Sequence, residues 1–352
     1  ATDIKEKYSF DTYLIARIVS NILMVLLLIG YIILNPNTHA NIGIIFWVSF
    51  FRVSEALSDV FQGLFQQRER LDIAGKSLFL RNTISTVVFA IVLLVSKNLL
   101  WSVILQTISS FLFIALFDYP NSRLFHTLNI RNVKLCKIIK VFKDCLPLFI
   151  NAFLLVSIYN QPKYALNDIY NKGLIENGVQ RDFSILFTPI FAMNLMIIFL
   201  RPMITQLAVF LEERKISHFI TYKNNLFRIL LGTCTLIYIV GAFIAIPALD
   251  IVYGTDLKQY QSSFLILLMG GVASTFSTVC DNILTVFRKQ HYLIISFVVG
   301  YLVSIMTART LVLKYEILGA SLSFLCAMIS WLIVSLVIYF ITSPYTIFRK
   351  KK

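Results

Sequence analysis

The sequence predicts an all-α integral membrane protein, and three observations lead to that prediction. Of the 352 residues, 58% are hydrophobic and 14% are charged, against about 25% charged residues in an average soluble domain. A soluble fold of this size has too little interior to bury that much apolar surface in one core. The apolar residues also form unbroken runs, such as 22–29, and these lack the alternation of a membrane barrel strand. Lipid is therefore the expected solvent, and helices are the expected spans.

Ten segments are long and apolar enough to be transmembrane helices, since about 20 apolar residues cross the bilayer core. No loop between them is long enough to hold a soluble domain. The fold expected from the residues is a bundle of ten helices. The approximate spans are 12–34, 42–65, 79–96, 99–118, 144–162, 183–210, 226–252, 261–286, 292–310 and 317–342.

The basic residues predict the orientation of these helices. If the N-terminal segment lies in the cytoplasm and the sides alternate, 22 of the 32 Lys and Arg residues fall on the inner side, Arg81 among them, and seven on the outer side. Three fall within helices: Arg17, Arg52 and Arg201. This excess follows the positive-inside rule and predicts cytoplasmic ends for the chain. The net charge of +14 thus indicates anionic headgroups rather than nucleic acid as the partner.

The longest and most basic inner segment, 119–143, is expected to join two lobes, 1–125 and 126–352. Within it, apolar residues alternate with lysines in the pattern Val133, Cys136, Ile138, Ile139 and Phe142. This pattern is typical of an amphipathic helix on the inner leaflet, although a plain basic connector has the same composition.

Neither metal nor catalytic chemistry is expected. The five cysteines form no C-x-x-C pair, and the four histidines have no zinc-type spacing. No catalytic signature or phosphate-binding loop is present. Asp118, at the end of the fourth predicted helix, is expected to be solvated. We therefore predict no enzyme, no cofactor and no metal site.

Three charged residues lie on one face of the second predicted helix. Arg52, Glu55 and Asp59 are three and four residues apart, and this spacing aligns them on one side. Because an ionisable side chain at mid-bilayer costs about 3 kcal/mol, that face does not look at lipid. It is either an internal ion-pair ladder or the wall of a polar cavity.

Two interpretations are also open for Arg17, in the first predicted helix. Its long side chain can reach the inner headgroups, or it can be a cation that faces a cavity.

The fifth predicted helix ends in a polar cluster near the outer surface. Asn160, Gln161 and Lys163 flank the helix-breaking Pro162, and Asn151 adds polarity earlier in the same helix. The cluster is either part of a cavity or an ordinary helix end with an interfacial anchor.

Two further polar positions lie near the inner ends of later helices. The sixth contains Pro189 and Arg201-Pro202, and the eighth contains Asp281. Two prolines predict a kinked sixth helix. Because Arg201 and Asp281 lie at comparable depth, they are expected to pair.

Three stretches carry a resemblance to a known family. They are Phe51–Gln67, which runs on through Arg70 to Ser77; Asn160–Ala165; and Phe183–Phe191, which continues to Arg201-Pro202. Together with the hydropathy pattern, they resemble the bacterial polysaccharide flippases of the Wzx type. Those proteins belong to the multidrug/oligosaccharidyl-lipid/polysaccharide (MOP) exporter superfamily.

The resemblance implies an architecture and a function. Family members commonly have twelve helices in two lobes of six, so ten helices suggest that a preceding pair is missing. The implied cargo is an undecaprenyl-diphosphate-linked oligosaccharide, carried from the cytoplasmic to the outer face of the bacterial plasma membrane for capsule, exopolysaccharide or O-antigen synthesis. Contact with polysaccharide polymerase machinery is also implied.

The expected site combines cations for the diphosphate, Arg17, Arg52, Lys163 and Arg201, with amides for the saccharide, Asn151, Asn160 and Gln161. Glu55, Asp59 and Asp281 are expected to orient those cations or to couple transport to an ion, H⁺ or Na⁺. Alternative functions are a lipid II flippase or a cation-coupled drug exporter of the same superfamily. An alternative from another class is a membrane polysaccharide polymerase.

Overall fold

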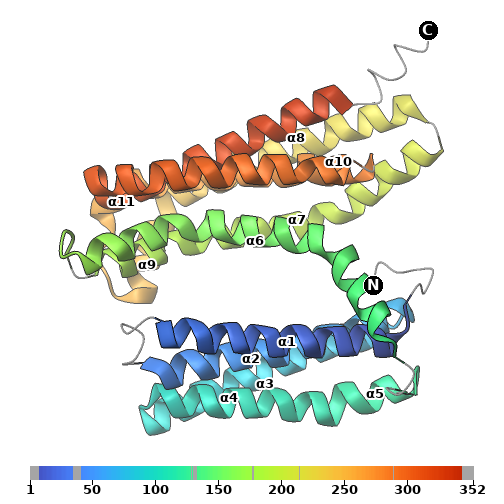
Figure 1. Ribbon diagram of the computed structural model, residues 1–352. Coiled ribbons are helices and arrows are strands. Elements are labelled where there is room, and N and C mark those ends of the chain that lie inside the picture. The colour runs from blue at the N-terminus through green and yellow to red at the C-terminus, as the bar shows by residue number, and fades with distance from the viewer. Residues whose placement is uncertain are drawn as a thin grey trace. The chain divides into compact units, whose positions relative to one another are not determined.

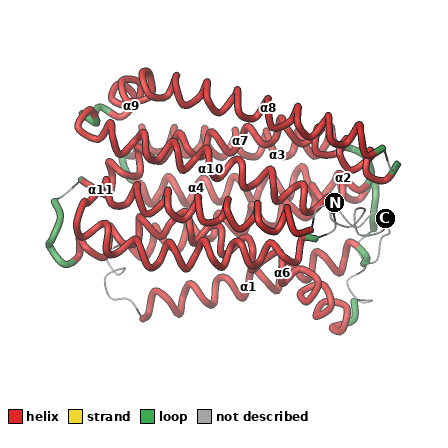
Figure 2. The backbone as a smooth tube through the Cα atoms, turned by 90° about the horizontal axis from the view of Figure 1, so that it is seen from above, coloured by secondary structure: helices red, strands yellow, loops and turns green. Residues whose placement is uncertain are grey.

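The structure of the chain is a computed structural model that describes residues 8–34, 41–127, 129, 133–176, 178–213, 215–287 and 289–342. Within these ranges all regular structure is helical, and short loops connect the helices (Figure 2). The chain divides into two compact units, which meet in sequence between Leu146 and Pro147 (Figure 1). Each unit is described by itself.

Unit 1 contains four long helices. They are α1 (Phe10–Leu34), α2 (Ile42–Gln67), α3 (Leu71–Ser96) and α4 (Leu99–Phe113), the last of which continues through a π-helical turn (Ile114–Asp118) into α5 (Tyr119–Arg123). The turn between α3 and α4 has only two residues. Lys97 takes the left-handed conformation that ends α3, and Asn98 caps α4 by accepting hydrogen bonds from the backbone N–H groups of Leu100 and Trp101.

Small residues allow the helices of unit 1 to pack closely around α2, which contacts α1, α3 and α4. Ser54 on α2 donates a hydrogen bond of 2.8 Å to Ser110 on α4, and both are fully buried. The Thr107 hydroxyl on α4 lies 3.3 Å from the backbone oxygen of Trp47 on α2. Small and hydroxylated residues at helix contacts are typical of membrane bundles.

The first part of α6 (Leu135–Asn171) also belongs to unit 1. Ile138 and Val141 pack against Ala16 of α1, while Ile139 and Phe142 are exposed. The segment is therefore helical, as the sequence predicted. Its place on the inner leaflet stays a prediction.

Unit 2 begins within α6, which runs well beyond its predicted end. Instead of ending at Pro162, the helix continues to Asn171 with Pro162 inside it. Proline removes one N–H group from the ladder, and membrane helices tolerate this because neighbouring groups satisfy the freed carbonyl. Lys163 accordingly lies within a helix and not in an outer loop.

The other helices of unit 2 are α7 (Val179–Glu212), α8 (Ile216–Val240), α9 (Ile246–Tyr253), α10 (Gln261–Val286) and α11 (Leu293–Thr342). A π-helical turn (Gly241–Ala245) joins α8 to α9, and single 3₁₀ turns precede α10 and α11. The centre of the unit is α10, which packs against α11, α7 and α8. Gly270 permits this packing, because a Cβ there would overlap the ring of Phe324 on α11.

The helix α11 consists of two passes that fold back on one another at Glu316. The backbone there is non-helical, with φ 47° and ψ −121°. The hydroxyl groups of Thr307 and Ser323 lie 2.9 Å apart, whereas sixteen residues of straight helix would separate them by about 24 Å. The two predicted spans 292–310 and 317–342 are these two passes.

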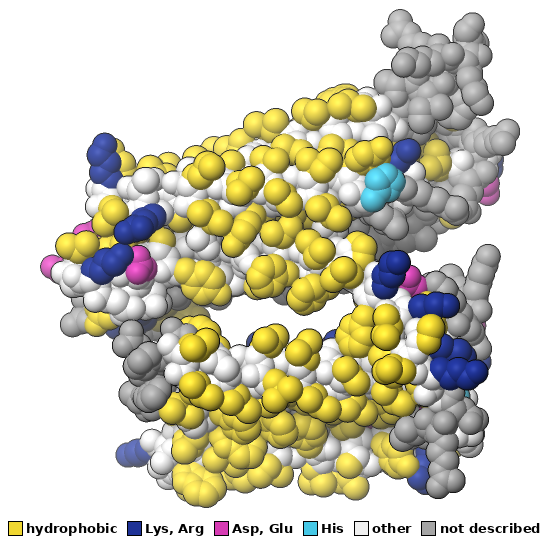
Figure 3. Space-filling model, viewed as in Figure 1, with side chains coloured by type: hydrophobic (Ala, Val, Ile, Leu, Met, Phe, Trp, Pro, Cys, Tyr) yellow, Lys and Arg dark blue, Asp and Glu magenta, His cyan; other side chains and the backbone are white. Residues whose placement is uncertain are grey.

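The described helices confirm the predicted fold class. Six of them are long and apolar enough to cross a membrane, and α6 would be a seventh if it is counted through its break. Each of the ten predicted segments lies within helical structure. On the face in view, hydrophobic side chains cover the sides of each unit, and charged side chains gather at the helix ends (Figure 3). The chain is a multi-pass membrane protein.

Candidate functional site

The charged face of α2 is exposed at the middle of the helix. Arg52 lies ten residues after the first residue of α2, and it pairs with Glu55 at 2.5 Å, one turn along. The Arg52 side chain is 69% exposed and that of Glu55 is 25% exposed. Asp59, one further turn along, is also exposed. The pair lies within one helix and is exposed, and the cavity wall that the sequence offers for this face stays a prediction.

Arg17 adds a second cation from the neighbouring helix. It lies half-buried on α1, seven residues after the first residue of that helix, and it interacts electrostatically with Asp59 on α2. This attraction brings the charge of Arg17 to bear on α2, while the choice between a headgroup contact and a cavity stays a prediction. Arg17, Arg52, Glu55 and Asp59 thus form one charged surface of unit 1, named here the α1–α2 charged surface.

Behind this surface lies a buried polar network that the sequence did not predict. Asp118 is fully buried and accepts hydrogen bonds from Ser58 on α2, at 2.7 Å, and from Ser77 on α3, at 2.6 Å. Gln62 extends the network by donating to Ser58 at 3.1 Å. The expectation of a solvated Asp118 is therefore wrong. The π-helical turn places this carboxylate against α2 and α3 instead of outside the bundle.

Arg81, which the sequence placed near the start of the third predicted helix and counted on the inner side, belongs to the same region. It lies in α3, and only 2% of its surface is exposed. Its Nε and Nη1 atoms are buried without a hydrogen-bond partner, and its charge acts on both Asp118 and Asp59. Because α3 begins eight residues before the predicted span, this arginine falls inside the helix bundle.

In unit 2, Lys163 lies against aromatic rings rather than beside an acid. Its Nζ is 4.7 Å from the ring centroid of Phe187 and 5.4 Å from that of Phe191, both on α7. Cation–π contacts of this kind hold an ammonium in place while leaving N–H donors for a ligand. The aromatic partners lie more than twenty residues away in sequence, so spacing alone could not indicate them.

The amides predicted beside Lys163 all lie on α6. Asn160 donates to the backbone oxygen of Val156 at 2.8 Å, which leaves its side-chain oxygen as an acceptor. Asn151 has a buried side-chain oxygen without a partner. Gln161 is half-buried. The side chain of Arg201 lies outside the described residues, although its backbone belongs to α7.

Asp281 is held by α11. Of its surface 7% is exposed, and it accepts hydrogen bonds from the Trp331 indole at 3.0 Å and from Ser335 at 2.7 Å. These are structural contacts within the helix packing. The expected pair with Arg201 stays a prediction, because that side chain is not described.

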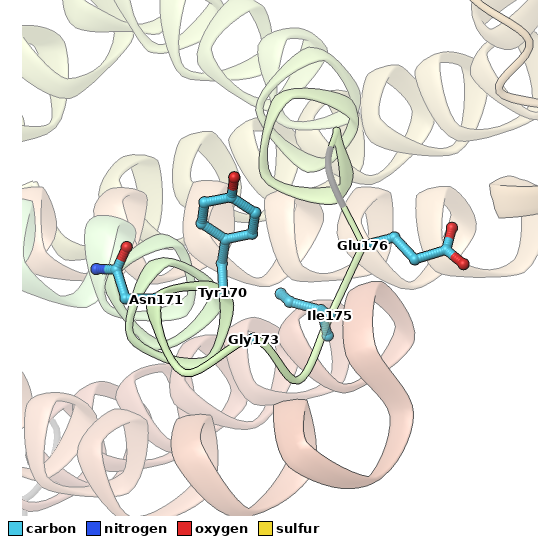
Figure 4. A pocket seen from close by; sticks show the side chains of 5 residues that line it. All are labelled: Tyr170, Asn171, Gly173, Ile175 and Glu176. Atoms are coloured by element: carbon cyan, nitrogen blue, oxygen red, sulfur yellow. The ribbon is translucent and has the colours of Figure 1, made fainter.

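A surface pocket of about 630 Å³ lies at the end of α6, away from the predicted site residues. Figure 4 shows Tyr170 and Asn171 from the helix end, with Ile175 and Glu176 from the turn that follows. The residues that line it include none of the predicted ones, and the sequence carried no signal for it.

Fold and charges together define a class: a multi-pass helical membrane protein with exposed charged side chains on α2. A solved structure with this fold is a multidrug-resistance MATE-family transporter of the MOP superfamily, in an outward-facing conformation. The TM-score is 0.63 and the identity 13%, over 97% of this chain and 79% of that one. The superfamily resemblance seen in the sequence is thus confirmed at the level of the fold.

A curated relative gives the more particular likeness. It is the capsular polysaccharide biosynthesis protein CapF of Staphylococcus aureus, 24% identical over 328 residues, which are 90% of this chain and 79% of the relative. No family model matches the chain.

Proposed function

We propose that the protein is a flippase for lipid-linked oligosaccharides. In this proposal it moves an undecaprenyl-diphosphate-linked repeat unit from the cytoplasmic to the outer face of the bacterial plasma membrane, for the synthesis of capsule or a related polysaccharide. The transporter fold and the likeness to a capsular polysaccharide biosynthesis protein support this reading. The observation that carries it is the α1–α2 charged surface, which presents the exposed Arg52 near the middle of α2.

The physical task explains why such a surface is needed. A diphosphate and several sugars must cross about 30 Å of hydrocarbon, while the lipid tail stays in the bilayer. Arginine binds phosphate oxygens bidentately, so Arg17 and Arg52 suit the diphosphate, while Lys163 and Arg201 suit the diphosphate or another anionic group of the cargo. Asn151, Asn160 and Gln161 suit sugar hydroxyls. Alternating access, in which one lobe rocks against the other, would move the headgroup across.

The acids have a supporting role in this proposal. Glu55 holds Arg52 by an ion pair, and Asp59 attracts Arg17. Together with Asp281 they orient the cations or bind a coupling ion, H⁺ or Na⁺. In this proposal both ends of the chain lie in the cytoplasm, which the excess of basic residues predicted on that side supports, and the protein contacts polymerase machinery.

The alternatives differ in what they need. A drug exporter for cationic drugs needs acids that face its cavity unpaired, whereas Glu55 is paired with Arg52. A lipid II flippase shares the diphosphate chemistry and differs only in its saccharide. A polysaccharide polymerase is an enzyme and needs a concentrated catalytic site. The flippase reading makes the protein a transporter and not an enzyme.

The test is translocation of a lipid-diphosphate-oligosaccharide in proteoliposomes. We expect Arg52→Gln to lower the transport rate at least tenfold, equivalent to about 1.4 kcal/mol of lost interaction. The matched control is Arg70→Gln, since Arg70 is an exposed arginine before α3 that pairs with Asp72. Equal rates in both variants would remove Arg52 from the path. No transport of a native substrate by the unchanged protein would favour the exporter or polymerase readings.

A further inference from the structure

Phe191 and Lys163 form an exposed aromatic–cation pair on unit 2. Phe191 is 48% exposed, and its ring centroid lies 5.4 Å from the ammonium of Lys163. Phe187, the second ring beneath the same ammonium, is fully buried. Phe191 is therefore the ring that remains open to a ligand.

Other aromatic rings hold the Phe191 ring in position. Tyr159 stacks on it with centroids 6.2 Å apart and an interplanar angle of 28°. Tyr159 and Phe187 in turn each pack edge-on against Phe324 of α11. A ring held in this way loses little conformational entropy when a ligand stacks on it.

Polar groups surround the exposed ring. Thr188 and Ser184 precede Phe191 by three and seven residues on α7, which places them on the same helical face, and Thr188 is exposed. On α6, Asn160 precedes Lys163 by three residues, and its side-chain oxygen takes no part in the bond that its amide nitrogen donates to Val156. Hydroxyl and amide groups beside an open aromatic ring are complementary to a sugar.

We propose that this surface binds an acidic sugar residue of the transported saccharide, an inference that rests on the proposed function. The apolar C–H face of a pyranose ring stacks on Phe191, because the negative face of the aromatic ring attracts C–H groups. The carboxylate of the sugar accepts a charge-assisted hydrogen bond from Lys163.

The aromatic ring distinguishes this ligand from the lipid diphosphate. A diphosphate has no apolar face, so a site built for it gains nothing from the exposed Phe191. No carboxylate of the described residues pairs with Lys163, so its charge is available to the ligand. In this inference Lys163 binds the saccharide, and the arginines of unit 1 bind the diphosphate.

The test measures binding of trigalacturonate and of neutral maltotriose to the detergent-solubilised protein by saturation-transfer-difference NMR titration. We expect trigalacturonate to bind more tightly than maltotriose. Lys163→Met should weaken the acidic ligand about tenfold and leave maltotriose unchanged, while Lys163→Arg retains binding. Phe191→Leu should weaken both ligands.

Two matched controls separate this site from general effects. Phe243→Leu removes a ring that is 77% exposed, and Lys172→Met removes a lysine that pairs with Asp168. Neither should alter binding. Trigalacturonate that binds equally to Lys163→Met and the unchanged protein would overturn the inference, as would displacement of trigalacturonate from Lys163 by inorganic pyrophosphate.

Transport separates this inference from the proposed function. If a lipid-linked neutral saccharide is translocated and trigalacturonate does not bind, the acidic-sugar site is overturned and the flippase function stands. If trigalacturonate binds as expected but no lipid-linked saccharide is translocated, the binding site stands and the flippase function fails.

Discussion

The indole N–H of Trp331 on α11 donates a hydrogen bond of 3.0 Å to Asp281 on α10. Ser335, one turn further along α11, donates to the other carboxylate oxygen at 2.7 Å. Both oxygens of a nearly buried acid are thereby used to join two helices. This bond pair makes Asp281 a structural element of unit 2, in addition to any part in ion coupling.

Asp281→Ala should therefore destabilise unit 2. The change leaves the Trp331 N–H and the Ser335 hydroxyl buried without acceptors, and each unsatisfied group costs about 1–3 kcal/mol. We expect the free energy of unfolding, measured by SDS titration in mixed micelles, to fall by at least about 2 kcal/mol. Ser335→Ala, which removes one donor and leaves the acceptor with Trp331, should cost less. Equal stability of Asp281→Ala and the unchanged protein would contradict the assignment.

Arg81 is predicted to stabilise the acids of unit 1 through its charge. Arg81→Met keeps most of the apolar volume but leaves the buried Asp118 without its neighbouring cation. We expect a loss of about 1 kcal/mol in unfolding free energy, because the two charges attract each other inside the bundle without forming an ion pair.

The control for Arg81 is a double-mutant cycle. In an Asp118→Asn background, Arg81→Met should cost about 1 kcal/mol less, because the charge that it compensates is gone. Additive effects of the two changes would show that Arg81 acts through packing alone.

These residues also show what the sequence could and could not predict. Spacing alone placed Arg52, Glu55 and Asp59 on one face, because a helix fixes the neighbours of a residue three and four positions along. The burial of Asp118 depends on Ser58 and Ser77, which lie 60 and 41 residues away. Such contacts between helices depend on packing, which leaves no local pattern.

The same difference explains the errors on Arg81 and Lys163. Arg81 was expected near the start of a helix and Lys163 in an outer loop, because a charged residue or a proline interrupts the apolar run there. In the structure the helices continue through both positions, since a helix keeps its backbone hydrogen bonds within itself in lipid. The ends of the apolar runs therefore underestimate the lengths of the helices, whereas each predicted segment lies within helical structure and the predicted segments 292–310 and 317–342 are the two passes that meet near Glu316.

Substitutions at two nearby positions of the reversal in α11 are expected to change the unfolding free energy in opposite directions. Glu316 has a positive φ that glycine adopts without strain, so Glu316→Gly should raise the unfolding free energy by about 1 kcal/mol. Gly319→Ala should lower it by about 1–3 kcal/mol, because a Cβ there would overlap the backbone oxygen of Leu311.

A glycine in open space is the matched control for Gly319. A Cβ at Gly232 in α8 meets nothing within 4 Å, so Gly232→Ala should be neutral or stabilising. If Gly319→Ala were as well tolerated as Gly232→Ala, the close approach of the two passes at Leu311 would be wrong.

The orientation of the chain is predicted from its basic residues and can be measured by cysteine labelling. Asn171 lies at the end of α6, on the predicted outer side, and Ser217 lies at the start of α8, on the predicted inner side; both are exposed. The five native cysteines, three of them exposed, are first replaced by alanine. A membrane-impermeant maleimide added to intact spheroplasts should then label Asn171→Cys and not Ser217→Cys, whereas both should react after permeabilisation. Because the excess of lysine and arginine determines which side stays in the cytoplasm, the reverse labelling pattern would place both chain ends outside. Every helix would then cross the membrane in the opposite direction from the one assumed in the proposed transport.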